Sequence, residues 1–262
     1  LHVLVQGERR PLDAAALLAQ CEAACHGLGE GVSAQRILEQ ALQNLYDGIP
    51  QADVQQALIL AARTLIEQDP DYDFATARLL LAQLIAEVIG EAVLPQDAAA
   101  SQAGYFAQGI ARGIDAQLLD PRLADFDLER LAAALRCERD GQFRYLGLQT
   151  LYDRYFLHID GQRIELPQAF YMRVAMGLAL NEIDREARAI EFYNVLSTFD
   201  FMSSTPTLFN AGTRRSQLSS CYLTTIADDL DGIYEGIKEN ALLSKFAGGL
   251  GNDWTPVRAM GS

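Results

Sequence analysis

Three short clusters in the last quarter of the chain carry residue types that could do chemistry. Residues 204–207 and 210–212 place hydroxyl groups around Pro206, and hydroxyls beside a turn can donate to a bound oxyanion. Cys221 lies among small polar residues just before a strand-like run, where a thiol could be redox-active. Residues 247–252 include three glycines in four positions, which would let the backbone approach a ligand and present N–H groups to a phosphate.

Each cluster, taken alone, also has an ordinary structural interpretation. The Ser-Thr-Pro-Thr run is typical of a turn at the start of a strand, and a free cysteine is commonly a buried, inert residue. The glycine-rich run lacks the ending of a P-loop and the spacing of a dinucleotide-binding fingerprint, which favours a bend between a helix and a strand. Asp228 and Asp229 precede a helical stretch, where carboxylates cap helix N-termini.

A metal site is not predicted. Cys21, Cys25 and His26 lie together on an expected helix, but zinc usually needs three or four ligands and no further Cys or His is near in sequence. We therefore expect the two cysteines to pack in a core. Cys137 receives the same interpretation, and Trp254 is expected to be a packing residue rather than a stacking platform.

Composition narrows the classes of protein that fit. Half of the 262 residues are apolar and 21% are charged, which predicts folded domains. The formal charge of −14 argues against binding to a nucleic-acid backbone. Four cysteines make no disulfide framework and indicate a reducing, cytoplasmic setting. No apolar run approaches the roughly 20 residues of a membrane span. The chain has no initial methionine, and we expect both ends to be cuts.

The elements that must position the three clusters are mainly helical. Up to about residue 90, apolar stripes predict a small helical unit opened by a short strand pair at Val3 and Val5. These stripes run through Ile37, Ala41, Leu42 and Leu45, then Val54, Ala57, Leu58, Ala61 and Ala62, then Leu80, Leu84 and Val88.

Further along, we expect helices over 91–120, 126–136, 169–180 and 184–198. Pro95 and Pro121 are expected to interrupt or end the first of these. A hairpin is predicted between 155–158 and 162–166, closed by Ile159-Asp160-Gly161. Beyond residue 199, Thr, Ser, Gly and Asn become frequent, which is typical of functional loops on a scaffold.

Taken together and in this order, the clusters resemble the large (alpha, catalytic) subunit of class I ribonucleotide reductases. Residues 199–213, 217–221, 248–251 and 257–259 carry the resemblance, with 145–155 and 166–168 upstream. It implies a mostly α fold. An ATP-cone-like domain over 1–92 would be followed by a helical reductase domain over 93–200, and then by the first strands of a ten-stranded α/β barrel over 201–262.

The resemblance implies that the parent protein is a ribonucleoside-diphosphate reductase, which reduces ribonucleotides to deoxyribonucleotides by thiyl-radical chemistry. Carried over by position, Cys221 resembles one member of the redox-active cysteine pair. The residues that resemble substrate-binding positions are Thr205, Ser220 and Gly249. Those that resemble the site of a deoxynucleotide effector, where Arg suits phosphate and Asp suits ribose or base, are Asp228, Asp229, Leu230 and Arg258.

Partners are implied in the same way. No cofactor would be bound directly. ATP and deoxynucleoside triphosphates would act as effectors, and a metal-containing small (beta) subunit would supply the radical. Thioredoxin or glutaredoxin would serve as reductant. The helix expected over 231–245 would pack across a homodimer interface. Neither nucleic acid nor membrane is an expected partner.

Two departures from the family pattern qualify the expected function. The family has basic residues in the first strand and first helix of the cone, whereas residues 4–7 and 13–17 contain none. The negative charge of a bound triphosphate would then have no basic partner, so we expect a degenerate ATP-cone. Such a cone would suit the second position in a chain that carries two cones in tandem. The family's radical-forming cysteine and the second redox cysteine are not found in these residues, and the chain alone is expected to be inactive. Two alternatives stay open: a non-catalytic, reductase-like nucleotide-binding regulator or scaffold, and a helical interaction protein whose clusters are all structural.

Overall fold

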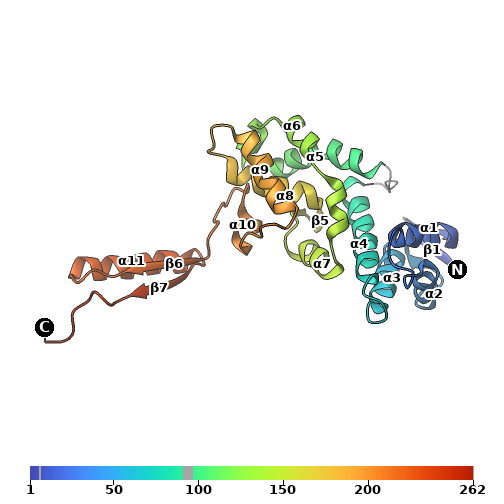
Figure 1. Cartoon of the computed structure of the whole chain (residues 1–262), viewed down its shortest axis with the longest axis horizontal. Helices are drawn as coiled ribbons and strands as arrows, with labels where there is room; N and C mark the ends of the chain where they lie inside the picture. The colour runs from blue at the N-terminus through green and yellow to red at the C-terminus, as the bar shows by residue number, and fades with distance from the viewer. Residues whose placement is uncertain (6, 91–96, 262) are drawn as a thin grey trace.

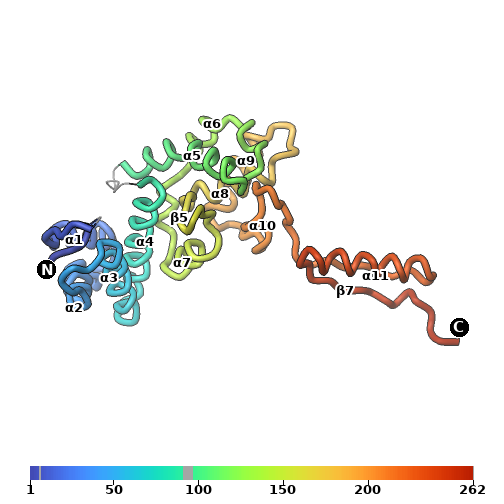
Figure 2. Tube along the Cα trace, turned by 180° about the vertical axis from the view of Figure 1, so that it is seen from behind, coloured from blue at the N-terminus to red at the C-terminus, as the bar shows by residue number. Residues whose placement is uncertain are grey.

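The computed structural model describes residues 1–5, 7–90 and 97–261. The N-terminal unit lies at one end of an elongated molecule, a larger helical body occupies the middle, and a narrow arm that begins with β6 lies at the other end (Figure 1). The view from behind shows the same three-part arrangement (Figure 2). The fold is mostly α, as predicted.

The N-terminal unit combines a small sheet with four helices. Its sheet has the strand order β2-β1-β3 and pairs β1 (His2–Val5) antiparallel to β2 (Glu8–Pro11) and parallel to β3 (Ile49–Pro50). The helices are α1 (Ala14–Cys25), α2 (Ala34–Gln43), α3 (Gln51–Thr64) and α4 (Tyr72–Ile89). The predicted strand pair and the three helical stripes are confirmed, although α2 ends before Leu45. The predicted boundary between residues 92 and 93 and the predicted break at Pro95 lie outside the described residues.

The cysteines of α1 pack as expected. Cys21 has no exposed surface and Cys25 is partly buried at the edge of the same core. Burial raises the pKa of the Cys21 thiol to about 12, because a thiolate would lose its hydration there. Cys21 is therefore a small apolar core residue rather than a reactive thiol.

The helical body follows. Its elements are α5 (Ala98–Asp115), η1 (Pro121–Asp125), α6 (Leu128–Ala134), η2 (Cys137–Gln142), α7 (Tyr145–Arg154), α8 (Pro167–Ala179) and α9 (Arg185–Ser197). The helices predicted over 169–180 and 184–198 correspond to α8 and α9. The helix predicted over 126–136 is shorter in the structure, because Asp127 caps α6 by accepting from the amide of Arg130 and Leu135 is already extended.

The predicted hairpin is present but much shorter than expected. Only β4 (His158–Ile159) and β5 (Gln162–Arg163) pair, so Ile159 belongs to a strand and the turn is Asp160-Gly161. Both turn residues have positive φ, 52° and 83°, as a tight hairpin turn requires. The ladder stops at Arg163 because the following residues turn inward: Ile164 and Leu166 enter the core and Glu165 meets a buried arginine.

The C-terminal arm is a β-α-β unit. Strand β6 (Cys221–Thr225) pairs in parallel with β7 (Gly249–Asp253), and α11 (Leu230–Lys245) makes the connection. A short helix, α10 (Thr205–Asn210), precedes the arm and replaces the turn that the Ser-Thr-Pro-Thr run predicted; Pro206 fits its first turn, where a missing N–H costs nothing. Trp254 is 47% exposed, so within this chain the expected packing role is not seen.

None of the helices in the described part of the chain has the length and apolar character needed to cross a bilayer.

Candidate functional site

Three of the predicted site residues meet at the start of the strand pair in the arm. Cys221 is the first residue of β6 and is exposed, and its sulfur lies 3.7 Å from the hydroxyl of Ser220. Gly249, the first residue of β7, is the register partner of Cys221. The Gly249 amide donates to the carbonyl oxygen of Ser220 at 2.6 Å. A thiol, a hydroxyl and a glycine are therefore gathered on one exposed edge.

The glycine-rich run begins with the bend between a helix and a strand that was considered for it: residues 246–248 link α11 to β7, and Ala247 has a φ of 59°. It does not form a phosphate loop. Residues 249–252 are part of β7, and the Gly249 amide is engaged with Ser220 instead of facing a ligand. The absence of a side chain still matters. A Cβ at Gly249 would lie 3.2 Å from the Ser220 carbonyl oxygen and 4.0 Å from the Cys221 sulfur. Glycine therefore avoids a tight contact with the Ser220 carbonyl oxygen, whereas an added Cβ would be at ordinary contact distance from the thiol sulfur.

Thr205 lies on a different element, α10, and makes no hydrogen bond to Ser220 or Cys221 in the described structure. Its hydroxyl is 3.2 Å from that of Tyr155. The same helix holds the segment that leads into β6: Thr207 donates to the carbonyl of Leu218 at 3.1 Å, and the Asn210 amide donates to that of Gln217 at 2.8 Å. Helix α10 and the segment before Ser220 thus form one hydrogen-bonded assembly.

The predicted effector residues gather at the other end of the same strands. Arg258 follows β7 and reaches Asp228, which follows β6: its Nε donates to Asp228 Oδ2 at 2.8 Å and its amide donates to Oδ1 at 3.1 Å. Asp229 caps α11 by accepting from the Gly232 amide at 2.8 Å, so the capping interpretation is confirmed for Asp229. Leu230, the first residue of α11, is 73% exposed.

The two groups of residues are separated by the length of a strand. Cys221 and Thr225 bound β6, and four steps of about 3.3 Å each give about 13 Å between the ends. Carboxyl ends of parallel strands commonly bind ligands, and the pair formed by Asp228 and Arg258 lies there. The arm therefore carries two separate groups of candidate site residues, linked by one β-α-β unit.

Two features that hold the β-α-β unit together were not predicted from the sequence. Gly232 and Gly236 lie one turn apart on α11, and a Cβ at either would come within 2.7 Å of Ala227 or 2.4 Å of Ile226. The Asn240 and Asn252 amides exchange hydrogen bonds of 2.6 and 3.1 Å, joining α11 to β7. The Gly-x-x-x-Gly spacing was a readable signal of close helix packing; nothing local to the sequence marked the Asn pair.

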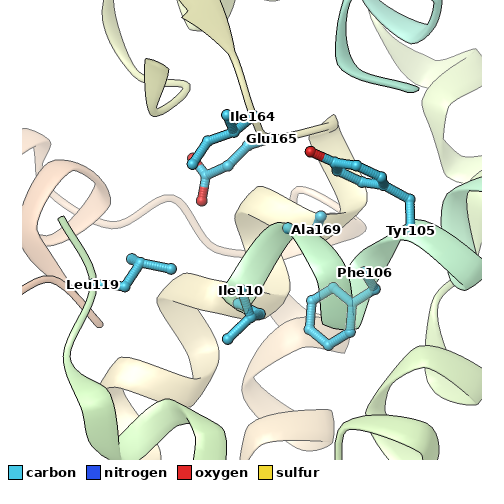
Figure 3. A pocket seen from close by; sticks show the side chains of 8 residues that line it. Tyr105, Phe106, Ile110, Leu119, Ile164, Glu165 and Ala169 are labelled. Carbon is cyan, nitrogen blue, oxygen red and sulfur yellow. The ribbon is translucent and has the colours of Figure 1, made fainter. Parts of the chain in front are cut away.

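Two hollows lie elsewhere in the described ranges. One, of about 540 Å³, is on the arm itself and is lined by residues 223–225 of β6 and 251–253 of β7. A pocket between α5 and α8 is lined by Tyr105, Ile164, Glu165 and their neighbours (Figure 3), but its volume of about 10 Å³ suits at most one water molecule. Among residues 1–5, 7–90 and 97–261, no group of three or more His, Cys, Asp or Glu side chains is placed to hold a metal ion.

Comparison with known proteins shows which family the chain matches. Residues 141–216 match the family model described as ribonucleotide reductase, all-alpha domain, and residues 219–262 match the model described as ribonucleotide reductase, barrel domain. The ribonucleoside-diphosphate reductase subunit alpha of Chlamydia trachomatis serovar D is 50% identical over 247 residues, which are 94% of this chain and 24% of that protein.

More distant relatives agree. Subunit alpha from Helicobacter pylori 26695 is 40% identical over 98% of this chain and 32% of its own length. The large subunit from Danio rerio is 36% identical over 90% of this chain and 30% of its own length. The chain thus spans about a quarter to a third of the length of these relatives. The chain belongs to the ribonucleotide reductase large-subunit family, and its matches cover the all-alpha domain and part of the barrel domain of that family.

Proposed function

We propose that this chain is the N-terminal part of a ribonucleoside-diphosphate reductase large subunit, which reduces ribonucleotides to deoxyribonucleotides by thiyl-radical chemistry. The observation that carries the proposal is the 50% identity to the chlamydial subunit over 94% of the chain. The arrangement of Cys221 beside Ser220 and Gly249 supports it, because a redox thiol must be reachable by both substrate and reductant.

Cys221 is the proposed redox-active thiol. It would give up its hydrogen as the ribose is reduced and end as a disulfide with a second cysteine outside these residues. Thioredoxin or glutaredoxin would restore both thiols by thiol–disulfide exchange. The other cysteines suit this role poorly, since burial raises the pKa values of Cys21 and Cys137 to about 12. A thiolate is accordingly scarce at both positions.

The substrate nucleotide is proposed to bind at Thr205, Ser220 and Gly249, where two hydroxyls and an open backbone edge are available. A deoxynucleotide or ATP effector is proposed to bind at Asp228, Asp229, Leu230 and Arg258. The Arg258 side chain is 63% exposed while it contacts Asp228, so its guanidinium can also meet a phosphate.

The proposed partners are a metal-containing small subunit, which supplies the radical, and a second copy of the large subunit. The dimer contact is proposed on α11, whose exposed apolar residues recur at helical spacing at Leu230, Tyr234 and Ile237. The N-terminal unit is proposed to be a cone that has lost its nucleotide. Its two arginines in β2 are engaged by carboxylates, Arg9 by Asp47 and Arg10 by Glu8.

Turnover of the full-length protein tests the proposal. Wild type, Cys221→Ser and Cys137→Ser would each be assayed with the small subunit, a ribonucleoside diphosphate and thioredoxin. Cys221→Ser should lose thioredoxin-dependent turnover, whereas the control Cys137→Ser should keep it. Full turnover by Cys221→Ser would refute the assignment. Wild-type protein that binds nucleotides without turnover would instead favour a non-catalytic regulator. These 262 residues alone are expected to give no product.

A further inference from the structure

Arg173 is the largest side chain that the described structure buries completely, and the functional assignments above leave it unexplained. It lies in the middle of α8, among apolar residues such as Met172 and Val174. A charged group is rarely held without solvent unless each of its polar atoms is engaged. The partners of this guanidinium therefore indicate what it does.

One side of the guanidinium is paired with Glu165. Nε donates to Oε1 at 2.8 Å and Nη2 donates to Oε2 at 3.0 Å, a bidentate pair in which the carboxylate is only 7% exposed. Glu165 Oε2 also accepts from the backbone amide of Leu157 at 2.9 Å. The carboxylate is thus fixed to the residue that precedes β4, and it fixes the plane of the guanidinium.

The other side of the guanidinium faces the end of α10. Nη1 donates to the carbonyl oxygen of Leu208 at 3.1 Å and to that of Ala211 at 2.9 Å. The last carbonyls of a helix have no partner within the helix, and a cation there also suits the helix dipole. Arg173 therefore caps the C-terminus of α10 from inside the protein. Helices α8 and α10 are neighbours in both overall views (Figures 1 and 2).

The backbone that follows α10 also packs against α8. A Cβ on Gly177 would lie 2.0 Å from the amide nitrogen of Gly212, and Gly212 itself has a φ of 75°. Its carbonyl accepts from the Asp120 amide at 3.0 Å on the opposite side. Residues 211–213 are thus held between α8 and η1, and α10 has little freedom to shift.

We propose that Arg173, oriented by Glu165, is a positioning residue for the substrate site. The contacts run from Glu165 to Arg173, to the carbonyls of α10, and through Thr207 and Asn210 to the segment before Ser220 and Cys221. Through them Arg173 sets where α10, and with it Thr205, lies relative to the thiol. This inference rests on the proposed substrate role of Thr205 and Ser220.

The test uses the full-length reductase with the double substitution Glu165→Gln/Arg173→Met. Removing both charges avoids leaving one of them buried and unpaired, which is the more damaging change. Arg173→Lys is the second variant: it keeps the pairing with Glu165 but lacks the planar fork that reaches the α10 carbonyls at the same time. It carries the test if the double variant does not fold.

Glu87→Gln is the matched control. Glu87 is a partly buried carboxylate on α4 that accepts from the Tyr152 hydroxyl at 2.8 Å and the Arg163 amide at 2.7 Å, and in the described structure none of its hydrogen bonds reaches α10. Its loss should loosen the body to a similar degree without moving the substrate site. Hydrogen exchange and steady-state kinetics would be measured on all variants.

We expect faster hydrogen exchange in peptides covering 205–221 and a rise of at least about tenfold in KM for the ribonucleotide, with a smaller change in kcat. Glu87→Gln should show neither. The proposal would be overturned if both Arg173 variants showed the same hydrogen exchange and the same KM as Glu87→Gln.

Thr205→Val and Ser220→Ala distinguish failure of the substrate assignment from failure of the positioning role. If they leave KM unchanged, the substrate assignment fails and the positioning role falls with it. If they raise KM while the Arg173 variants do not, only the positioning role is wrong.

Discussion

Asp140 gives the helical body a pH-dependent stability that one substitution should remove. The carboxyl is 5% exposed and accepts from the Gln168 amide at 2.7 Å, while the Gln102 amide is a distant 3.4 Å away. Burial raises the pKa of Asp140 from its ordinary 3.8 to about 7, because the charged form is poorly solvated there. A neighbouring acceptor, Gln102 Oε1, is buried without a partner in the described structure.

The direction of this pH dependence follows from proton binding. Between pH 3.8 and about 7 the folded chain holds a proton on Asp140 that the unfolded chain has released, so stability falls as the pH rises toward 7. With 1.36 kcal/mol per pKa unit, the penalty relative to a neutral group is about 2 kcal/mol at pH 5 and about 4 kcal/mol at pH 8. Above pH 7 it is constant.

Asp140→Asn should remove this penalty. The Asn oxygen can still accept from Gln168, and its NH₂ can donate to the unpartnered Gln102 oxygen once that amide turns. The free energy of unfolding of Asp140→Asn, relative to that of the wild type, should rise by about 2–3 kcal/mol between pH 5 and pH 8.

Urea unfolding followed by circular dichroism at several pH values measures that growth. Asp153→Asn is the control, because it removes the same charge from an exposed position on α7. An advantage of Asp140→Asn that does not change with pH, or a variant that is less stable than wild type at pH 8, would refute the reasoning.

Three further outcomes are expected. Gly232→Ala should destabilise the arm by about 1–3 kcal/mol, because its Cβ would lie 2.7 Å from the Cβ of Ala227, which no side-chain rotation can move away; unchanged protection of α11 in hydrogen exchange would count against this. Arg258→Ala in the full-length protein should weaken deoxynucleotide binding by calorimetry at least about tenfold, and equal affinity would contradict the effector assignment. In timed alkylation with iodoacetamide, Cys221 should react well before Cys137, whose pKa burial raises to about 12; the reverse order, read by mass spectrometry, would show the exposure argument to be wrong.

Much of the architecture could be predicted from local patterns. The stripes through Ile37, Leu58 and Leu84 marked helices correctly, because a helix that must bury one face repeats apolar residues at its own period. The Asp160-Gly161 turn was likewise readable, since few residues accept positive φ. Element ends were less predictable: the hairpin strands and α6 are shorter than their patterns indicated, because caps and inward-turning side chains decide where they stop.

The candidate sites depended on a different kind of information. Order and spacing of the motifs were enough to name Cys221, Ser220 and Arg258, because the resemblance to reductase large subunits is carried by residue identities. Whether these residues meet was settled only by the β-α-β unit, which places Gly249 beside Cys221 and Arg258 beside Asp228. Their roles stay predictions until substrate and effector binding are measured.

The sequence by itself determined the helical character of the chain, its family and the residue types available for chemistry, since these follow from local periodicity and identity. Only the tertiary structure revealed that Arg173 is completely buried and caps α10, and that Asp140 is a buried carboxyl with a raised pKa. Both depend on partners 28 to 38 residues away in the chain. Burial and long-range pairing are properties of the packed core, and no local pattern of residues specifies them.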